Sequence, residues 1–446
     1  MTEKSGSSLA LAIRLFLHEG PRALWNRAQD RLEEKDRLRG LPTLREDKGG
    51  LSIDFEPPPV LNVSPIPPSP KRGGAQIQLL DRLAEEKKMR TVALAYPRDG
   101  IWWLEIWAAT NTGVFRLGSA GEEVDLVERA AKLAGTSVVH VESLAGLPLN
   151  LVEDLEDRNL ATVLSIHDFT LFCRRPHLIE TATTDFCEYC QDPDRCGACL
   201  QDTDPGPFVT QADYRRAGAA AYKKATLAIY PSTFLQRQHQ ALFPGLRGPG
   251  RDVVIAPASL RPAFPVIPST EQPRIAFVGG VFSHKGGALI APTMKRLRDH
   301  ISNAVGYVYG NGDGELLREL RRTTGIHIRG YHRQGKLPEM LERDRISVAV
   351  LPSICPESYS LVFDECLSAG VPVIAFGIGA VGDRLVDLGA GRLVPMHLGA
   401  GGLADAIVEH LSSGLEVPGD AIASLPTPAR AAQLHIGLYD SLATGA

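Results

Sequence analysis

The chain has 446 residues, a formal net charge of −4 and 44% apolar residues, a composition typical of a globular protein with two or three domains. This charge implies no general affinity for nucleic acid or anionic membranes. No apolar run approaches the roughly 18 residues that span a bilayer, and Arg14 and His18 interrupt the apolar N-terminal stretch. We therefore expect a soluble, cytoplasmic protein without a signal peptide.

Residues 1–57 are predicted to form a helical extension and a connector ahead of the first domain. The apolar spacing over 7–38 favours helix, with a break at Gly20–Pro21, and residues 40–59 are polar and rich in turn formers. The helix fits two interpretations, one packed on its own protein and one lying on a membrane surface or a partner. A peripheral position at the inner face of a membrane, or in a complex, therefore stays open.

The first domain is predicted over residues 58–262. A strand at 60–63, the glycine pair Gly73–Gly74 and a helix over 76–88 form the unit that brings backbone close to phosphate or substrate. A plain tight turn explains the two glycines equally well. Strands and helices then alternate, which predicts a doubly wound parallel sheet. The strands are 91–96, 114–117, 137–141, 162–166 and 226–230, and the helices are 122–134, 148–158, 214–224 and one opening at Pro231–Ser232.

His167 and Asp168 follow the predicted strand 162–166. The carboxyl ends of parallel strands form the edge where α/β folds bind ligands, so these two side chains are candidates for a cleft. A histidine at this position can also serve only as a structural hydrogen-bonding group.

Two C-x2-C pairs occupy a predicted insertion over residues 185–205 and are separated by five residues: Cys187, Cys190, Cys196 and Cys199. Four thiolates form tetrahedral sites that suit zinc in a reducing compartment. We predict a structural zinc ion here, with free cysteines and an iron–sulfur cluster as the alternatives.

A proline-rich linker over 263–273 leads to a second domain over 274–415, followed by a tail and closing helix over 416–446. The first strand of the second domain runs into Gly279–Gly280 and then Ser283-His284-Lys285-Gly286. Glycines let the backbone approach a diphosphate and a lysine neutralises its charge, although a single lysine is more often exposed to solvent. Further strands are predicted at 306–310, 326–329, 347–351, 373–376 and 390–394, and helices from 315, 337 and 403 and over 431–442.

Two glutamates, Glu357 and Glu365, are separated by seven residues around a helix predicted from Ser358 to Ala369. Glu357 precedes the helix, where free backbone N–H groups attract anions. Glu365 falls on the apolar arc, where a carboxylate is costly unless it binds a group such as a ligand hydroxyl. The structural alternative is that Glu357 complements the dipole and Glu365 caps a neighbouring loop.

The glutamate pair, the run Ala369 to Ala375 and the turn Gly379–Ala380 together resemble the nucleotide-binding half of retaining family 4 glycosyltransferases, of the type that builds bacterial polysaccharides and O-antigens. The resemblance covers about residues 58–446. It implies the GT-B fold, in which two Rossmann-like domains face a cleft. It also implies transfer of a sugar from a nucleotide-sugar donor to a glycan or lipid-linked acceptor, without a catalytic metal.

The resemblance assigns roles to individual residues. Glu357 contacts the donor sugar, Glu365 holds the ribose, and His167 lines the reacting face. Lys285 neutralises the diphosphate, and the remaining donor-binding residues are Gly73, Gly74, Gly279, Ser358, Tyr359, Ser360 and Leu361. Gly280 departs from the family pattern, because the family places an arginine there; Arg384 is one residue that could replace its charge.

Two other functions fit the sequence. A nucleotide-binding or scaffolding subunit with weak turnover is favoured by Gly280, and a nucleotide-sugar isomerase on the same fold would need no acceptor. The intact glutamate pair favours the transferase.

Overall fold

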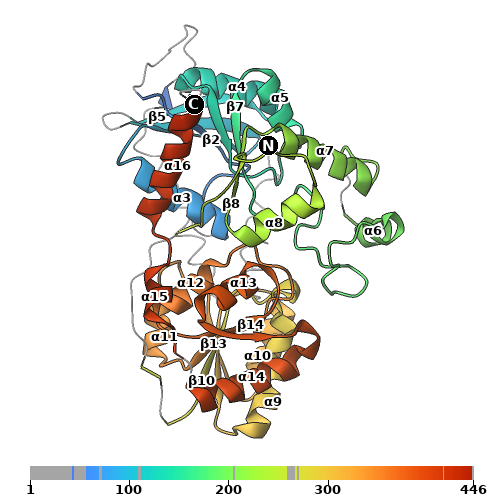
Figure 1. The fold of residues 1–446 in the computed structure, drawn as a ribbon, viewed down its shortest axis with the longest axis vertical. Coiled ribbons are helices and arrows are strands. Elements are labelled where there is room, and N and C mark those ends of the chain that lie inside the picture. Colours follow the sequence, from blue (N-terminus) through green and yellow to red (C-terminus); the bar gives the residue numbers. More distant parts are fainter. Residues whose placement is uncertain are drawn as a thin grey trace, which may run out of the picture.

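The computed structural model describes residues 43–44, 57–69, 73–108, 112–203, 206–258, 267–268, 271–414 and 416–443. The predicted N-terminal helix and most of the proline-rich linker lie outside these residues. Two α/β domains lie one above the other in Figure 1, and each has a sheet with helices packed against it. Within the described part of the chain, no helix is both long and apolar enough to cross a bilayer.

The N-terminal domain contains a nine-stranded sheet in the order β1-β5-β4-β3-β2-β6-β7-β8-β9, counted over the described residues. Strands β2, β6, β7, β8 and β9 pair in parallel, as predicted from the alternation of strands and helices. The strands are β1 (Thr43–Leu44), β2 (Leu61–Val63), β3 (Val92–Arg98), β4 (Ile101–Trp107), β5 (Thr112–Ser119), β6 (Val138–Val141), β7 (Ala161–Ser165), β8 (Leu227–Tyr230) and β9 (Asp252–Val254).

The prediction of a wholly parallel sheet is wrong at one side of this domain. Strand β4 was not predicted, and it pairs antiparallel with both β3 and β5. Its connection to β3 is the dipeptide Asp99–Gly100, with φ of 52° and 74°. Asp-Gly with two positive φ angles is the preferred hairpin turn, because its twist matches that of the strands it joins. The sequence therefore held a hairpin signal that the alternation of elements obscured.

Helices of the N-terminal domain cover the sheet and extend from it. They are α3 (Gly74–Glu86), α4 (Glu123–Ala134), α5 (Leu151–Asp157), α6 (Pro193–Leu200), α7 (Gln211–Lys224) and α8 (Thr233–Leu242). Helix α6, which was not predicted, lies within the cysteine-rich segment. It begins where the Asp192 carboxylate accepts a hydrogen bond from the Arg195 amide and Pro193 occupies the first turn, and both are helix-start signals.

The C-terminal domain contains a wholly parallel six-stranded sheet in the order β12-β11-β10-β13-β14-β15, as predicted for a doubly wound domain. Its strands are β10 (Arg274–Val278), β11 (Val305–Tyr309), β12 (Ile326–Gly330), β13 (Val348–Leu351), β14 (Val373–Phe376) and β15 (Gly391–Val394). Its helices are α9 (Ile290–His300), α10 (Gly314–Arg322), α11 (Leu337–Arg343), α12 (Leu361–Ser368), α13 (Gly379–Leu388), α14 (Gly399–Ser413) and α15 (Gly419–Ala423).

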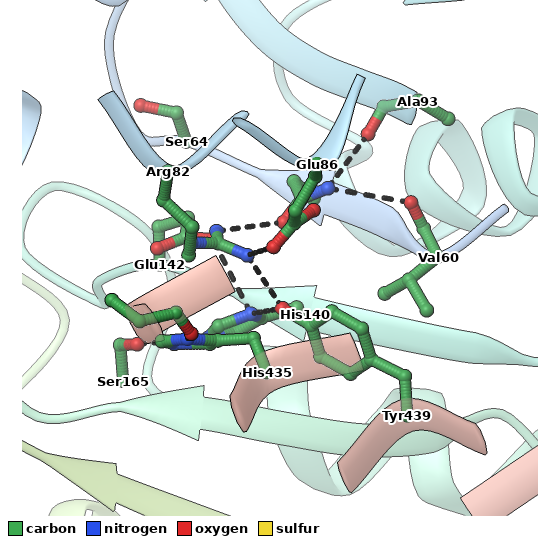
Figure 2. A network of polar contacts seen from close by, with 12 residues as sticks. Val60, Ser64, Arg82, Glu86, Ala93, His140, Glu142, Ser165, His435 and Tyr439 are labelled. Atoms are coloured by element: carbon green, nitrogen blue, oxygen red, sulfur yellow. Dashed lines mark hydrogen bonds and ion pairs between the residues drawn. The ribbon is translucent and has the colours of Figure 1, made fainter. Parts of the chain in front are cut away.

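Helix α16 (Pro428–Ala443) crosses back and packs against α3 of the N-terminal domain (Figure 1). There it completes a buried polar network around Arg82, shown in Figure 2. The Arg82 guanidinium donates to Glu86 Oε1 and Tyr439 Oη, each at 2.6 Å, and also to the Glu142 carboxylate. Tyr439 Oη lies 2.6 Å from Nδ1 of His140, whose Nε2 lies 2.8 Å from Ser165 Oγ. The network therefore connects α3, β6, β7 and α16.

Arg82 faces the carboxyl groups of Glu86 and Glu142, so the net charge of the network depends on pH. Burial raises the pKa of Glu142 to about 7, although Arg82 acts in the opposite direction. Burial also raises the pKa of Glu86 and, together with Arg82, holds the pKa of His140 well below its usual value. With His140 neutral, a proton on one carboxyl group balances the charge.

The raised pKa predicts a change of stability with pH. A carboxyl group whose pKa is raised by folding stabilises the protein below its unfolded pKa of about 4.3, and this contribution is lost as the pH rises through about 7. We expect the free energy of unfolding to fall by up to about 1.4 kcal/mol per pH unit in this range, and to fall less in Glu142→Gln. Chemical denaturation across the range measures both slopes. Glu122→Gln, at an exposed position, is the control, and equal slopes in wild type and Glu142→Gln would contradict the assignment.

Candidate functional site

The predicted residues of the C-terminal domain gather at one edge of its sheet. Strands β10 and β13 are neighbours, yet the chain leaves β10 toward β11 on one side and continues from β13 toward β14 on the other. The loops that follow β10 and β13 diverge at such a switch point and leave a crevice between them. Lys285 lies on the first loop and Glu357 on the second.

The loop that carries Lys285 packs directly on the end of β13. A 3-10 helix, η1 (Ser283–Lys285), ends at Gly286, where φ is +71°. A Cβ atom on Gly286 would lie 1.8 Å from the carbonyl oxygen of Pro352, so glycine is required both for the conformation and for the contact. The carbonyl of His284 also accepts a hydrogen bond from the Ile354 amide at 3.2 Å. The two loops therefore form one unit.

Lys285 and Glu357 form an ion pair across this crevice. Lys285 Nζ lies 2.6 Å from Glu357 Oε1, and both side chains are half-buried. Burial alone would lower the pKa of Lys285, but Glu357 outweighs it and holds the pKa above its usual value. Burial alone would raise the pKa of Glu357, but Lys285 and the hydrogen bond between them hold it below its usual value. Both groups are therefore charged near neutral pH.

The predicted turn Gly379–Ala380 holds Glu357 in place. The Ala380 amide donates to the Glu357 carbonyl at 2.8 Å. A Cβ atom on Gly379, where φ is +69°, would lie 2.5 Å from the Glu357 backbone nitrogen. The backbone of Glu357 is thus clamped between the ends of β13 and β14, and its side chain extends toward Lys285.

The helix between the glutamates begins later than predicted. Helix α12 starts at Leu361 rather than Ser358, because Ser360 takes a left-handed φ of 80° that a helix cannot contain. The carbonyl of Ser358 instead accepts a hydrogen bond from Ser232 Oγ of the N-terminal domain at 2.7 Å. Tyr359 is buried and its hydroxyl donates to the Asp364 carboxylate at 2.9 Å. Its side chain is therefore structural.

Arg384, which could replace the charge of the arginine missing at Gly280, is engaged with residues around the start of α12. Its guanidinium pairs with the Asp364 carboxylate and lies 4.1 Å above the Tyr359 ring. These contacts fix the start of α12.

Glu365 is fully buried on α12, on the face predicted from its spacing. Its Oε1 accepts a hydrogen bond from the Gly335 amide at 2.6 Å, so it caps the loop before α11. Oε2 lies 4.0 Å from Nε2 of His332, whose pKa burial lowers to about 4. His332 was not singled out from the sequence. The capping interpretation of Glu365 is therefore realised in the structure, beside a neutral imidazole.

The glycine turn of the N-terminal domain faces the start of α12. Gly73 precedes α3 with a φ of 89°, and residues 70–72 before it lie outside the described residues. A Cβ atom on Gly74 would lie 3.4 Å from Leu361 Cδ1. The structure thus brings together two segments that are nearly 300 residues apart in the chain.

His167 lies two residues after β7 and is half-buried. Burial lowers its pKa, and Asp168 and a hydrogen bond to the backbone of Glu142 oppose that effect. Asp168 Oδ1 accepts a hydrogen bond from the Thr170 amide at 2.8 Å, which makes Asp168 a turn-forming residue. The backbone of Glu142 links His167 to the buried network of Figure 2.

Two further histidines, one from each domain, are in contact. His177, from the loop after β7, stacks on His284 with 4.2 Å between ring centroids and an angle of 7° between the ring planes. No motif in the sequence singles out either residue as part of a pair, because the contact joins different domains.

The four predicted cysteine ligands lie close together. They line one cavity of about 20 Å³ together with Cys173, and the cavity also contacts Arg195 and Arg215. However, no group of three or more histidine, cysteine, aspartate or glutamate side chains in the described residues is arranged to hold a metal ion. The positions fit a shared site, whereas the side chains as they stand do not form one.

A larger cavity, of about 320 Å³, lies elsewhere, between α8 and the loop before β9. It contains none of the predicted site residues. Asp252, which lines it, pairs with Arg247, so the charged groups there are engaged with each other.

Comparisons with known proteins find similarity to glycosyltransferases. Residues 272–413 match the family model described as Glycosyl transferases group 1. A phosphatidyl-myo-inositol mannosyltransferase of Mycolicibacterium smegmatis is 28% identical over 124 residues. That match covers 28% of this chain and 32% of the relative, so the chain spans about a third of the curated relative it matches.

Solved structures share the fold over most of the chain. Sucrose-phosphate synthase from Thermosynechococcus elongatus has a TM-score of 0.61 and 17% identity, with 87% of this chain and 100% of that chain covered. A lipopolysaccharide outer core galactosyltransferase in its apo form has a TM-score of 0.57 and 10% identity, with 86% and 99% covered. The Anabaena protein HepE in complex with UDP and glucose has a TM-score of 0.56 and 15% identity, with 85% and 99% covered. The two-domain fold is that of GT-B glycosyltransferases.

The close packing at Gly286 can be tested by adding a methyl group. Gly286→Ala places an L-residue in the left-handed region, which costs about 1–2 kcal/mol, and its Cβ meets the Pro352 carbonyl. We expect thermal or chemical denaturation to show a loss of at least that size. Gly437→Ala is the matched control, because this helical glycine has open space and the change should add about 0.5–1 kcal/mol. Equal stability of Gly286→Ala and wild type would exclude the tight contact.

Proposed function

We propose that this chain is a glycosyltransferase that moves a sugar from a nucleotide-sugar donor to a glycan or lipid-linked acceptor, with retention of configuration, in cell-surface polysaccharide biosynthesis. The observation that carries the proposal is the Lys285–Glu357 ion pair, at the switch point of a sheet and facing the other domain. The glycosyltransferase match of residues 272–413 supports it.

The diphosphate of the donor belongs beside Lys285. A leaving nucleoside diphosphate gains negative charge in the transition state, and a fixed cation in a partly desolvated crevice stabilises that charge more than water does. Lys285 exchanges the Glu357 carboxylate for the diphosphate oxygens. The backbone N–H groups at the start of α12 add a second source of positive potential. These groups supply the charge neutralisation that a metal ion would otherwise provide, so we propose metal-independent chemistry.

The carboxylates bind hydroxyl groups of the donor. Once Lys285 turns to the diphosphate, Glu357 is able to accept hydrogen bonds from the sugar hydroxyls, which positions the anomeric carbon. Glu365 binds the ribose through the carboxylate that now caps the Gly335 amide, which places the base over the loop before α11. His167 lines the reacting face from the N-terminal domain. Approach of the two domains excludes water, which suppresses hydrolysis of the donor.

The donor can be identified by ligand-induced stabilisation. HepE, which shares the fold, binds UDP and glucose, so a panel of nucleoside diphosphates and nucleotide sugars begins with UDP-glucose. A ligand at about 100 times its dissociation constant adds roughly 2.7 kcal/mol to the free energy of unfolding. We expect a rise in melting temperature with one base, and loss of that rise in Glu365→Ala and Lys285→Ala. Glu319→Ala, at an exposed position on α10, is the control and should keep it.

Gly280 favours a second candidate function, a nucleotide-binding or scaffolding subunit with weak turnover. Gly280 offers no cation, and Arg384 is engaged with Asp364. The same panel separates the two functions. Binding of a nucleotide sugar followed by sugar transfer to an acceptor supports the enzyme. Binding with neither sugar transfer nor hydrolysis of the donor supports the subunit.

We also propose a structural zinc ion at Cys187, Cys190, Cys196 and Cys199, whose role is to hold the cysteine-rich segment in shape. The shared cavity supports the proposal, and binding requires the side chains to turn toward a common centre. Elemental analysis of protein purified without chelator should find about one zinc per chain. Cys196→Ser should lose the metal, whereas Cys173→Ser, which changes a cysteine outside the two C-x2-C pairs in the same cavity, should keep it. Metal-free wild-type protein would exclude the site.

A further inference from the structure

The loop that carries His177 is held rigidly at its base. Leu178, the next residue, is buried and has a left-handed φ of 58°, a strained conformation for leucine. Its amide donates to the Arg175 carbonyl at 2.9 Å, and its carbonyl accepts from the Cys187 amide at 2.8 Å. The buried leucine side chain and these two hydrogen bonds fix the strained turn. His177 therefore projects from the N-terminal domain in a defined direction.

The contact that His177 makes lies beside the ion pair. Its ring stacks on His284, which also stacks on the ring of Phe282, with 5.7 Å between centroids and 8° between planes. His284 directly precedes Lys285, so the stack restrains the short 3-10 helix that presents Lys285 to Glu357. The N-terminal domain thus contacts the loop that carries Lys285 through the His177 imidazole.

Electrostatics favour the stack near neutral pH. Burial and the nearby Lys285 lower the pKa of His177, while Asp168 and Glu357 act in the opposite direction. Burial, His177 and Lys285 lower the pKa of His284 to about 4. Two neutral imidazoles can lie face to face at 4.2 Å without the repulsion that two imidazolium ions would feel.

We propose that His177 is a positioning residue for the donor: by stacking on His284 it closes the N-terminal domain onto the Lys285 loop and holds Lys285 toward the diphosphate. This inference rests on the proposed function. It also gives the cysteine-rich segment a role, because the Cys187 amide donates a hydrogen bond to the carbonyl of Leu178, which follows His177. Through this hydrogen bond the cysteine-rich segment holds the His177 imidazole in place against the loop that carries Lys285.

The test compares wild type, His177→Ala, His177→Phe and the matched control His300→Ala. His300 is exposed at the end of α9, at the opposite edge of the sheet from Lys285. Calorimetry measures the dissociation constant of the nucleotide sugar that stabilises wild type most in a panel containing UDP-glucose. Small-angle scattering measures the radius of gyration without ligand, and the melting temperature without ligand reports on the fold.

We expect His177→Ala to bind about 3- to 10-fold more weakly and to have a larger radius of gyration than wild type, since an aromatic pair contributes about 0.5–1.5 kcal/mol. His177→Phe keeps a flat ring and should bind as wild type does, and His300→Ala should be unchanged. His284→Ala should match His177→Ala, and the double variant should be no weaker than either single variant, because each change removes the same contact.

The outcomes separate this inference from the function on which it rests. Wild-type affinity and a wild-type radius of gyration in His177→Ala would overturn the inference and leave the proposed function in place. Binding of no nucleotide sugar by wild-type protein would overturn the proposed function. Additive losses in the double variant would also overturn the inference, because they would show that the two rings act separately.

Discussion

The Lys285–Glu357 ion pair is the interaction on which the arrangement of the crevice depends. Each charge would be costly to leave partly buried alone, so the loops that follow β10 and β13 must meet where the two side chains can pair. Gly286 and Gly379 are required for that meeting, since a side chain at either position would collide with the loop that follows β13. The pair also keeps both groups charged, so an anionic ligand finds a cation already oriented and needs only to displace a carboxylate.

A second constraint is the buried polar network around Arg82 in the N-terminal domain. Arg82 satisfies two carboxylates and a phenol in a region closed to solvent, and every partner comes from a different segment of the chain or turn of helix. Buried polar networks stabilise one arrangement strongly only when all members are satisfied. His167 is attached to this network through Glu142. The hydrogen-bonded interior of the N-terminal domain therefore extends to His167.

The hydrophobic periodicity and the turn-forming residues of the sequence predicted most strands and helices of both domains, and the carboxyl-end rule placed His167 at a sheet edge. The start of α12 was misplaced because the left-handed turn at Ser360 has no sequence signal in serine. The Ile101–Trp107 strand was missed although its Asp-Gly turn was present. His177, His284 and His332 could not be assigned, because each gains its meaning from a contact with a residue of another segment. Arg384 likewise has a partner that spacing alone cannot reveal.

The return of α16 to the N-terminal domain has a consequence for the order of folding during synthesis. Tyr439, near the end of the chain, supplies the hydroxyl between Arg82 and His140, so the interior of the first domain is incomplete while the second is still being translated. At about 5–20 residues per second, the ribosome needs on the order of ten seconds or more to pass from β9 to α16. For that time Arg82 and its carboxylates lack a covering helix. The interior of the nascent first domain therefore closes only after α16 has been synthesised.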